Sequence, residues 1–159
     1  MTWVAPDPAF EASVRASFAR QAMMATLGAR IVHIAPGELD LAAPAAAAFG
    51  QQNGYWHAGA VASLADSANG YAAFTLARPG SDVLAVEFKI NLLAPARGDQ
   101  FLACGRVVRP GRTLTVCQAE VFAETTADAE AAAVANPPPA RILIAIMSST
   151  LIIRASAAP

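Results

Sequence analysis

Four segments with β-strand character follow one proline-free, alanine-rich stretch, and this order restricts the possible folds more than any other feature of the sequence. The alanine-rich stretch, residues 57–77, carries one apolar stripe at helical spacing, formed by Val61, Leu64, Ala65, Ala68 and Ala72. The β segments are residues 83–93, 100–108, 112–123 and 140–153, with Gly-, Pro- or Ala-rich breaks between them. Long strands after one buried helix favour an antiparallel sheet wrapped around that helix, an α+β architecture.

The opposite side of the same predicted helix carries small residues. These are Gly59, Ser63, Ser67 and Gly70. Because small side chains let neighbouring backbones come close, we expect strands or another helix to approach this side.

The chain before the predicted central helix indicates a further helix and a hairpin. Apolar residues at helical spacing predict one amphipathic helix over residues 7–27, which Gly28 ends. Residues 31–34 and 38–41 flank the turn pair Pro36-Gly37 and predict a short hairpin.

The length indicates one domain. The chain has 159 residues, which fits one compact core at residues 28–159 with an N-terminal helical extension at residues 1–27. The low-complexity residues 126–139 predict a mobile hairpin loop between the last two β segments.

The composition indicates a surface that is partly covered. Apolar residues make up 55% of the chain, above the roughly 45–50% of average globular proteins, while 14% are charged and the net charge is −1. Few charges exclude a disordered chain, and the lack of a basic excess argues against sequence-independent nucleic-acid binding. The longest apolar run, residues 142–153, is interrupted by polar residues and is too short to span a membrane. We therefore expect a homo-oligomer, with neither a nucleic-acid nor a membrane partner.

The N-terminus and the cysteines indicate a reducing compartment. The first residues have neither the basic start nor the apolar run of a signal peptide, so we expect a cytoplasmic location. Cys104 and Cys117 lie in apolar β segments without a second ligand at metal-binding spacing, and we expect two buried free thiols and no metal site.

One isolated carboxylate is the sharpest chemical signal. Asp66 is the only Asp, Glu, Lys or Arg between Leu41 and Ala77. Burial among alanines raises the pKa of such a carboxyl and makes it a stronger base or a poised nucleophile. The alternative is a solvent-facing or loop-capping aspartate.

The loop before the predicted central helix is the second candidate. Residues 51–59 bring amides, an imidazole and two glycines to a helix N-terminus, where free N–H groups can bind developing negative charge. His57 and Asp66 are nine residues apart, so they do not form an intrahelical pair, and His57 is also explained as an N-terminal cap.

Three arginines form the third candidate. Arg106, Arg109 and Arg112 surround a predicted strand–turn–strand with Pro110-Gly111, and arginine suits bidentate phosphate contacts. The alternative is a solvated hairpin tip. Motifs for nucleotide hydrolysis, dinucleotide binding, serine hydrolases and zinc proteases are all missing from the sequence.

Three segments together resemble one known family. Residues 53–68 resemble the G-x-x-H-[GA]-G-x-x-x-x-L-x-D signature of the hot-dog-fold acyl-CoA thioesterases of the phenylacetate-pathway (PaaI-like) family. Residues 86–96 resemble that family's strand ending in a Pro-Ala pair, and residues 107–113 resemble its Gly-Arg/Lys hairpin. The likeness runs in order from about Gly28 to Ile153 and is specific for the family, not for a substrate.

The resemblance implies a hot-dog fold, dimers with two active sites at the subunit interface, and often a dimer of dimers. It also implies that Asp66 activates water or attacks the thioester, and that the backbone N–H of Ala58 polarises the thioester carbonyl. The chain departs from the family pattern at three positions. Gln51 stands where many relatives have an asparagine, Ala58 replaces a glycine, and Ala85 replaces a hydroxyl that some relatives present from the partner's strand.

We therefore predict an α+β hot-dog enzyme that hydrolyses a medium-chain or aromatic acyl-CoA without a cofactor or metal. The candidate catalytic residues are Asp66, Gln51, His57, Ala58 and Gly59, and the candidate substrate- and CoA-binding residues are Asn53, Arg109, Gly111, Arg112 and Thr113. One alternative is a non-catalytic acyl-CoA-binding module. The other is a hot-dog dehydratase or hydratase, although the proline-rich loop after the histidine that is typical of those enzymes is missing.

Overall fold

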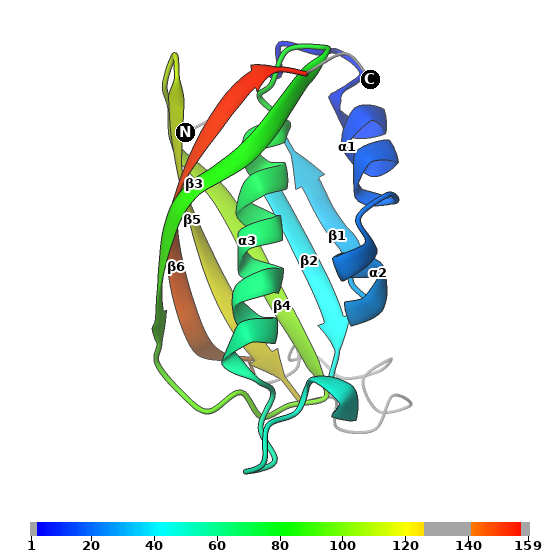
Figure 1. Cartoon of the computed structure of the whole chain (residues 1–159), viewed down its shortest axis with the longest axis vertical. Helices are drawn as coiled ribbons and strands as arrows, with labels where there is room; N and C mark the ends of the chain where they lie inside the picture. Colours follow the sequence, from blue (N-terminus) through cyan, green and yellow to red (C-terminus); the bar gives the residue numbers. More distant parts are fainter. Residues whose placement is uncertain (1–2, 126–140, 157–159) are drawn as a thin grey trace.

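The computed structural model describes residues 3–125 and 141–156, so the predicted loop at residues 126–139 lies outside the described residues. A six-stranded antiparallel sheet with strand order β1-β2-β4-β5-β6-β3 curves around helix α3 (Figure 1). The predicted α+β architecture is confirmed. The strands are β1 (Arg30–Ala35), β2 (Glu38–Pro44), β3 (Ser81–Leu92), β4 (Gln100–Pro110), β5 (Leu114–Glu124) and β6 (Arg141–Ala155). The helices are α1 (Phe10–Phe18), α2 (Ala22–Leu27), α3 (Ala58–Phe74) and the short 3₁₀ helix η1 (Ala47–Phe49).

Helix α3 fills the concave face of the sheet. Its predicted apolar stripe is buried in full, because all five residues of the stripe are at most 1% exposed. Strand β4 passes close behind the helix at Gly105, where a Cβ atom would lie 2.4 Å from the carbonyl oxygen of Ala68. The close approach therefore depends on a glycine of the sheet, and no other residue fits there without moving the helix.

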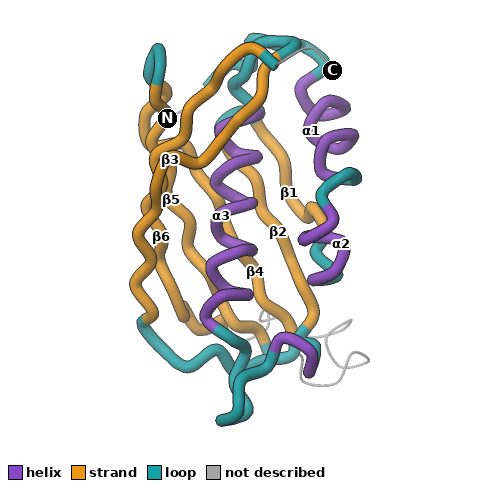
Figure 2. The backbone as a smooth tube through the Cα atoms, in the orientation of Figure 1, coloured by secondary structure: helices purple, strands orange, loops and turns teal. Residues whose placement is uncertain are grey.

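Two of the four residues on the small-residue side of α3, Gly59 and Gly70, have no close neighbour from another element of the described chain. A Cβ atom on Gly70 would meet no other atom within 4 Å, and one on Gly59 would meet only the ring of His57. No strand of the described chain therefore uses these glycines for close packing. Figure 2 shows α3 lying between β3 and the N-terminal helices. On this side of the helix, Ser67 is buried and donates to Gln21, whereas Gly59 is exposed and Gly70 is partly exposed.

The predicted single N-terminal helix is wrong in one detail, because it is broken into α1 and α2. The break falls at Gln21, whose backbone is extended, with φ −84° and ψ 97°. Ala19, Arg20 and Gln21 are ordinary helix formers, so nothing in their local sequence indicates a break. The break is stabilised by tertiary contacts instead, since the side chain of Gln21 is hydrogen-bonded to Ser67 on α3.

Strand β3 forms one edge of the sheet and pairs only with β6 among the described strands. Its exposed apolar side chains are Leu84, Val86, Phe88 and Leu92, each between 45% and 56% exposed. A long edge strand with exposed apolar residues is unusual in a monomer, because it offers both free backbone groups and apolar surface to another chain.

Candidate active site

The N-terminus of α3 is held in place by the loop before it. The Trp56 indole is buried and stacks on Phe101 with ring centroids 4.2 Å apart, and the backbone N–H of Trp56 donates to the Ala96 carbonyl at 2.9 Å. The His57 N–H donates to the Phe49 carbonyl at 2.7 Å. Gly54 takes a φ of 78°, which favours glycine at this turn. These contacts fix the direction in which the helix begins.

The first backbone amide of α3 makes no hydrogen bond to the residues that the structure describes. The first four N–H groups of a helix have no partner within the helix. His57 is the N-cap and accepts from the Gly59 N–H through Nδ1 at 2.8 Å, while its carbonyl accepts from Ala60 and Val61. The capping role proposed for His57 is therefore observed. Ala58 alone of these four has an N–H with no acceptor among the described residues.

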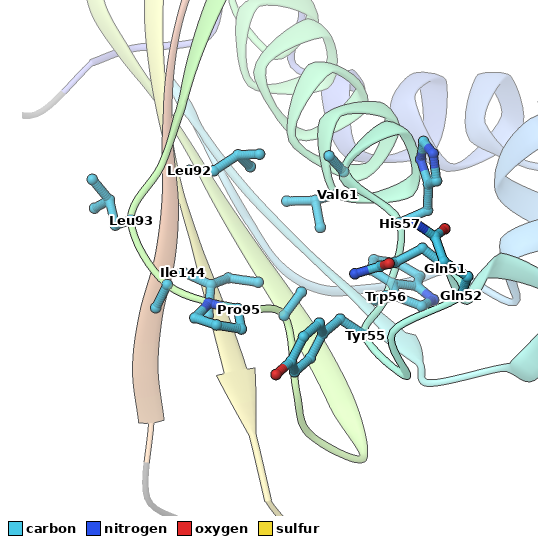
Figure 3. Close-up of a pocket in the computed structure, with 13 residues that line it drawn as sticks. Gln51, Gln52, Tyr55, Trp56, His57, Val61, Leu92, Leu93, Pro95 and Ile144 are labelled. Carbon is cyan, nitrogen blue, oxygen red and sulfur yellow. The ribbon is translucent and has the colours of Figure 1, made fainter.

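Ala58 opens onto a cavity of about 540 Å³. In Figure 3, Val61 on α3 and Leu92 at the end of β3 point toward each other across this cavity, and the imidazole of His57 points away from its apolar wall. Apolar side chains, including Pro95 and Ile144, form most of the wall. The site therefore offers the Ala58 N–H as a hydrogen-bond donor at the edge of a largely apolar space, which is an arrangement expected of a small-molecule pocket.

Gln51 and Asn53 differ in their relation to this cavity. Gln51 lines it, and its side-chain oxygen accepts from the Asn53 N–H at 3.0 Å, which stabilises the turn. Asn53 is exposed and does not line the cavity.

Asp66 lines a second cavity, of about 250 Å³, on the small-residue side of α3. Burial raises the pKa of the Asp66 carboxyl above its ordinary value, and no other cause contributes to the shift. Its Oδ1 atom is buried and makes no hydrogen bond to a described residue. The predicted environment of this carboxylate is therefore present, and a half-buried, unpaired carboxylate is a candidate base or nucleophile.

Within one chain, Ala58 and Asp66 do not reach the same atom. They are eight residues apart on one helix, which corresponds to about 12 Å along its axis. They also line different cavities. One chain therefore separates the predicted oxyanion donor from the predicted carboxylate.

The arginine hairpin lies at the Asp66 end of the molecule. Leu114, next to the β4–β5 turn, pairs with Ile152 of β6, which pairs in turn with Leu84 of β3 at the wall of the Asp66 cavity. Figure 1 shows this turn projecting at the end of the sheet away from the start of α3. Arg109, Arg112 and Thr113 are exposed there. A Cβ atom on Gly111 would lie 2.2 Å from the Leu114 carbonyl oxygen, so this glycine is required by the turn itself.

Polar residues of the N-terminal segment also line the Asp66 cavity, and none of them was predicted as a site residue. Gln21, between α1 and α2, lines this cavity together with Ser17. It lies 45 positions before Asp66, and its contact with α3 depends on the break between the two short helices, which no local pattern shows.

The cysteines are free, as predicted, but they differ in exposure. Cys117 is buried and Cys104 is partly exposed. Burial raises the pKa of Cys117 to about 12 and is the main cause that raises the pKa of Cys104 to about 11. Both are therefore protonated thiols at neutral pH and are poor nucleophiles.

Neither a metal-binding cluster nor a membrane-spanning helix is found in the described part of the chain. Over residues 3–125 and 141–156, no three His, Cys, Asp or Glu side chains gather to hold a metal ion. Among the helices of these same residues, none combines the length and the apolar character needed to cross a membrane.

Comparison with known proteins assigns the family. Residues 53–130 match the model of the thioesterase superfamily. A thioesterase family protein from Silicibacter pomeroyi has a similar crystal structure, with a TM-score of 0.83 and 44% sequence identity over 92% of this chain and 99% of that one. The PaaI protein of the E. coli phenylacetic acid degradation operon is 19% identical and has the same fold, with a TM-score of 0.77 over 96% of this chain and 99% of that one.

A curated relative agrees with this assignment. A protein of Saccharolobus solfataricus, named as a candidate esterase, is 30% identical over 59% of this chain and 66% of its own length. The chain belongs to the thioesterase superfamily. It is a thioester hydrolase with the hot-dog fold, so the predicted family, fold class and enzyme class are confirmed.

Proposed function

We propose that this protein hydrolyses an acyl-CoA to the free acid and CoA. The observation that carries the proposal is a pair of polar groups on α3 that have no partner among the described residues: the Ala58 N–H at an apolar cavity and the half-buried Asp66 carboxylate. The amide binds the negative charge that develops on the thioester oxygen, and the carboxylate acts as a general base or as the nucleophile. His57 and Gly59 support this site by capping and shaping the start of the helix.

The two groups act on one thioester when two copies of the chain associate. If two β3 strands pair at their free edges about a two-fold axis, they run antiparallel, and the Leu84 end of one strand lies beside the Leu92 end of the other. Leu84 lines the Asp66 cavity and Leu92 lines the Ala58 cavity. The pairing therefore brings Asp66 of one copy toward Ala58 of the other, and a homodimer contains two such sites.

The small-residue side of α3 supports the same assembly. Gly59, Ser63 and Gly70 lie on this side and are not buried, and a Cβ atom on Gly70 would meet no atom of the described chain within 4 Å. The helix of a second copy can approach it, and the exposed apolar residues of β3 become covered at the same time. The family resemblance adds a further proposal, that two dimers associate into a tetramer.

We assign the acyl group and the CoA part of the substrate to different surfaces of the protein. The apolar wall of the larger cavity suits a medium-chain or aromatic acyl group. The exposed Arg109 and Arg112 suit the phosphates of CoA. In a dimer with a two-fold axis, the hairpin of one copy lies toward the Ala58 end of the other copy. We propose that Gln51 orients water or substrate at this end, and we assign Asn53 and Thr113 to the rim that faces CoA.

The variant Asp66→Asn tests the proposal. It keeps the shape of the side chain and removes its charge, so we expect kcat on the best acyl-CoA to fall by about a hundredfold or more. The fold and oligomeric state remain, and the unfolding temperature at neutral pH equals or exceeds that of the wild type, because a partly buried charge is removed.

The assay follows release of CoA with a thiol reagent over a panel of acyl-CoA esters. A wild-type rate for Asp66→Asn would assign this aspartate a structural role. If the wild type binds acyl-CoA without releasing CoA from any ester, the protein is a binding module. Hydration or dehydration of a β-hydroxyacyl or enoyl ester would instead assign it to the hot-dog hydratases.

A further inference from the structure

The cavity that Asp66 lines is formed in part by the N-terminal segment that precedes the hot-dog core. One side is α3, the second is the beginning of β3, and the third is the junction of α1 and α2 with Ser17 and Gln21 (Figure 2). The N-terminal extension therefore contributes to the space in front of the carboxylate.

The carboxamide of Gln21 is hydrogen-bonded to α3. The Ser67 hydroxyl donates to its Oε1 atom at 3.2 Å, and the backbone N–H of Gln21 donates to the Phe18 carbonyl at 3.0 Å. The hydroxyls of Ser17 and Tyr71, 3.3 Å apart, attach the end of α1 to α3 beside it. The side-chain oxygen of Gln21 is thus engaged, while its Nε2 amino group has no acceptor among the described residues.

Asp66 lines the same cavity and has an acceptor that complements the Gln21 donor. It is adjacent in sequence to Ser67, the residue that holds Gln21, and it makes no hydrogen bond to a described residue. Gln21 offers a donor without an acceptor, and Asp66 offers an acceptor without a donor. A molecule that accepts from one and donates to the other is suited to the space between them, and water does both.

We propose that Gln21 is a positioning residue that holds the hydrolytic water against Asp66. This inference rests on the proposed function, with Asp66 as the general base. The Gln21 amino group donates to one lone pair of the water oxygen, and the second lone pair remains for attack. The donor to water then comes from the N-terminal extension, since Ala85, which lines the same cavity, has no polar side-chain group.

The reaction then balances without another reactant. The water oxygen forms the new bond to the thioester carbon while Asp66 takes a water proton, and the Ala58 amide of the partner subunit stabilises the oxyanion. The C–S bond breaks next. Asp66 returns the proton to the departing sulfur, which yields the free acid and the CoA thiol.

The test compares Gln21→Ala and Gln21→Glu with the wild type in the full-length protein. Both remove the donor, and the glutamate keeps the size and an oxygen that can accept from Ser67. We expect kcat to fall about 10- to 100-fold in both variants, with KM within about twofold, since a misplaced reactant costs rate rather than affinity. Thr26→Ala is the control, because Thr26 lies on α2, bonds only to the Ala22 carbonyl and does not line the cavity. It should keep kcat and KM.

Substrate dependence separates positioning of water from a structural role. A group that holds water lowers kcat by the same factor for a short aliphatic and an aromatic acyl-CoA, whereas a wall of the acyl pocket changes KM differently for the two. The inference is overturned if Gln21→Glu keeps the wild-type kcat, or if either variant changes only KM. If the wild type hydrolyses acyl-CoA, Asp66→Asn does not and both Gln21 variants are fully active, only this inference fails. An inactive wild type refutes the proposed function instead.

Discussion

Asp66 differs from an ordinary surface aspartate because no described group compensates its charge. Desolvation alone raises the pKa of its carboxyl, and neither a cation nor a hydrogen-bond donor of the described chain opposes the shift. A carboxylate without such partners gives up few favourable interactions when it accepts a proton from water or attacks an ester. This property is required of a general base or a nucleophile.

The pH dependence of activity follows from this shift. Both roles of Asp66 require the ionised form, so kcat/KM rises with pH through the pKa of this carboxyl, and the raised pKa places that rise above the ordinary value of 3.8. Asp82 and Tyr71 also line the cavity and are the other titratable groups that face Asp66. The residual activity of Asp66→Asn should not show this rise.

A profile of kcat/KM from acid to neutral pH checks the expectation, and Asp82→Asn serves as the control. If wild-type activity is independent of pH through the acid range, or if Asp82→Asn removes the rise while Asp66→Asn keeps it, the assignment of the base to Asp66 is wrong.

At the scale of elements, the β4–β5 hairpin is predicted to bind the phosphate end of CoA. Arginine–phosphate hydrogen bonds contribute about 1.5–3 kcal/mol each, so Arg109→Ala/Arg112→Ala should raise KM for acyl-CoA by about one to three orders of magnitude. The thioester lies elsewhere, so kcat should change little.

The matched substrate is the same acyl group on N-acetylcysteamine, which has the thioester and no phosphate. Its KM should be unaffected in the double variant. Equal losses on both substrates would mean that the arginines support the fold or the pocket, and no loss on either would leave them as a solvated hairpin tip.

The elements of the core could be predicted from the sequence because each has its own local signal. The apolar stripe of α3 has period 3.6, the strands are bounded by glycine and proline, and His57 lies where a cap belongs. The break at Gln21 and the close approach of Gly105 to Ala68 could not be predicted, because both depend on residues far apart in sequence. The distance between Ala58 and Asp66 follows from their spacing on one helix. The cavities that the two residues line could not be predicted, because they depend on tertiary packing.

At the scale of the whole molecule, β3 is predicted to be the edge through which two copies join. Val86→Lys places a charge among the exposed apolar residues of β3 and should shift the protein toward monomers with little activity. Val32→Lys is the matched control, since Val32 is a 45% exposed valine on β1, the strand at the other edge of the sheet.

Native mass spectrometry at micromolar concentration measures both variants. The wild type and Val32→Lys should be dimers or larger. A monodisperse wild-type monomer with full activity would contradict the shared site.

The central claim is that one thioester lies between Asp66 of one chain and Ala58 of another, and a mixing experiment tests it directly. Asp66→Asn removes the carboxylate. Ala58→Pro removes the amide donor at the first position of α3, where proline is tolerated and where the extended ψ of 138° at His57 suits a following proline. Each variant alone should lose activity by about a hundredfold or more.

When the two variants are co-refolded in equal amounts, half of the dimers are mixed, and each mixed dimer has one site with both groups intact. If the site is shared between the two subunits, activity returns to about a quarter of the wild-type value. If Asp66 and Ala58 act within one chain, every site in the mixture lacks one of them, and activity that stays at the level of the separate variants would contradict the account.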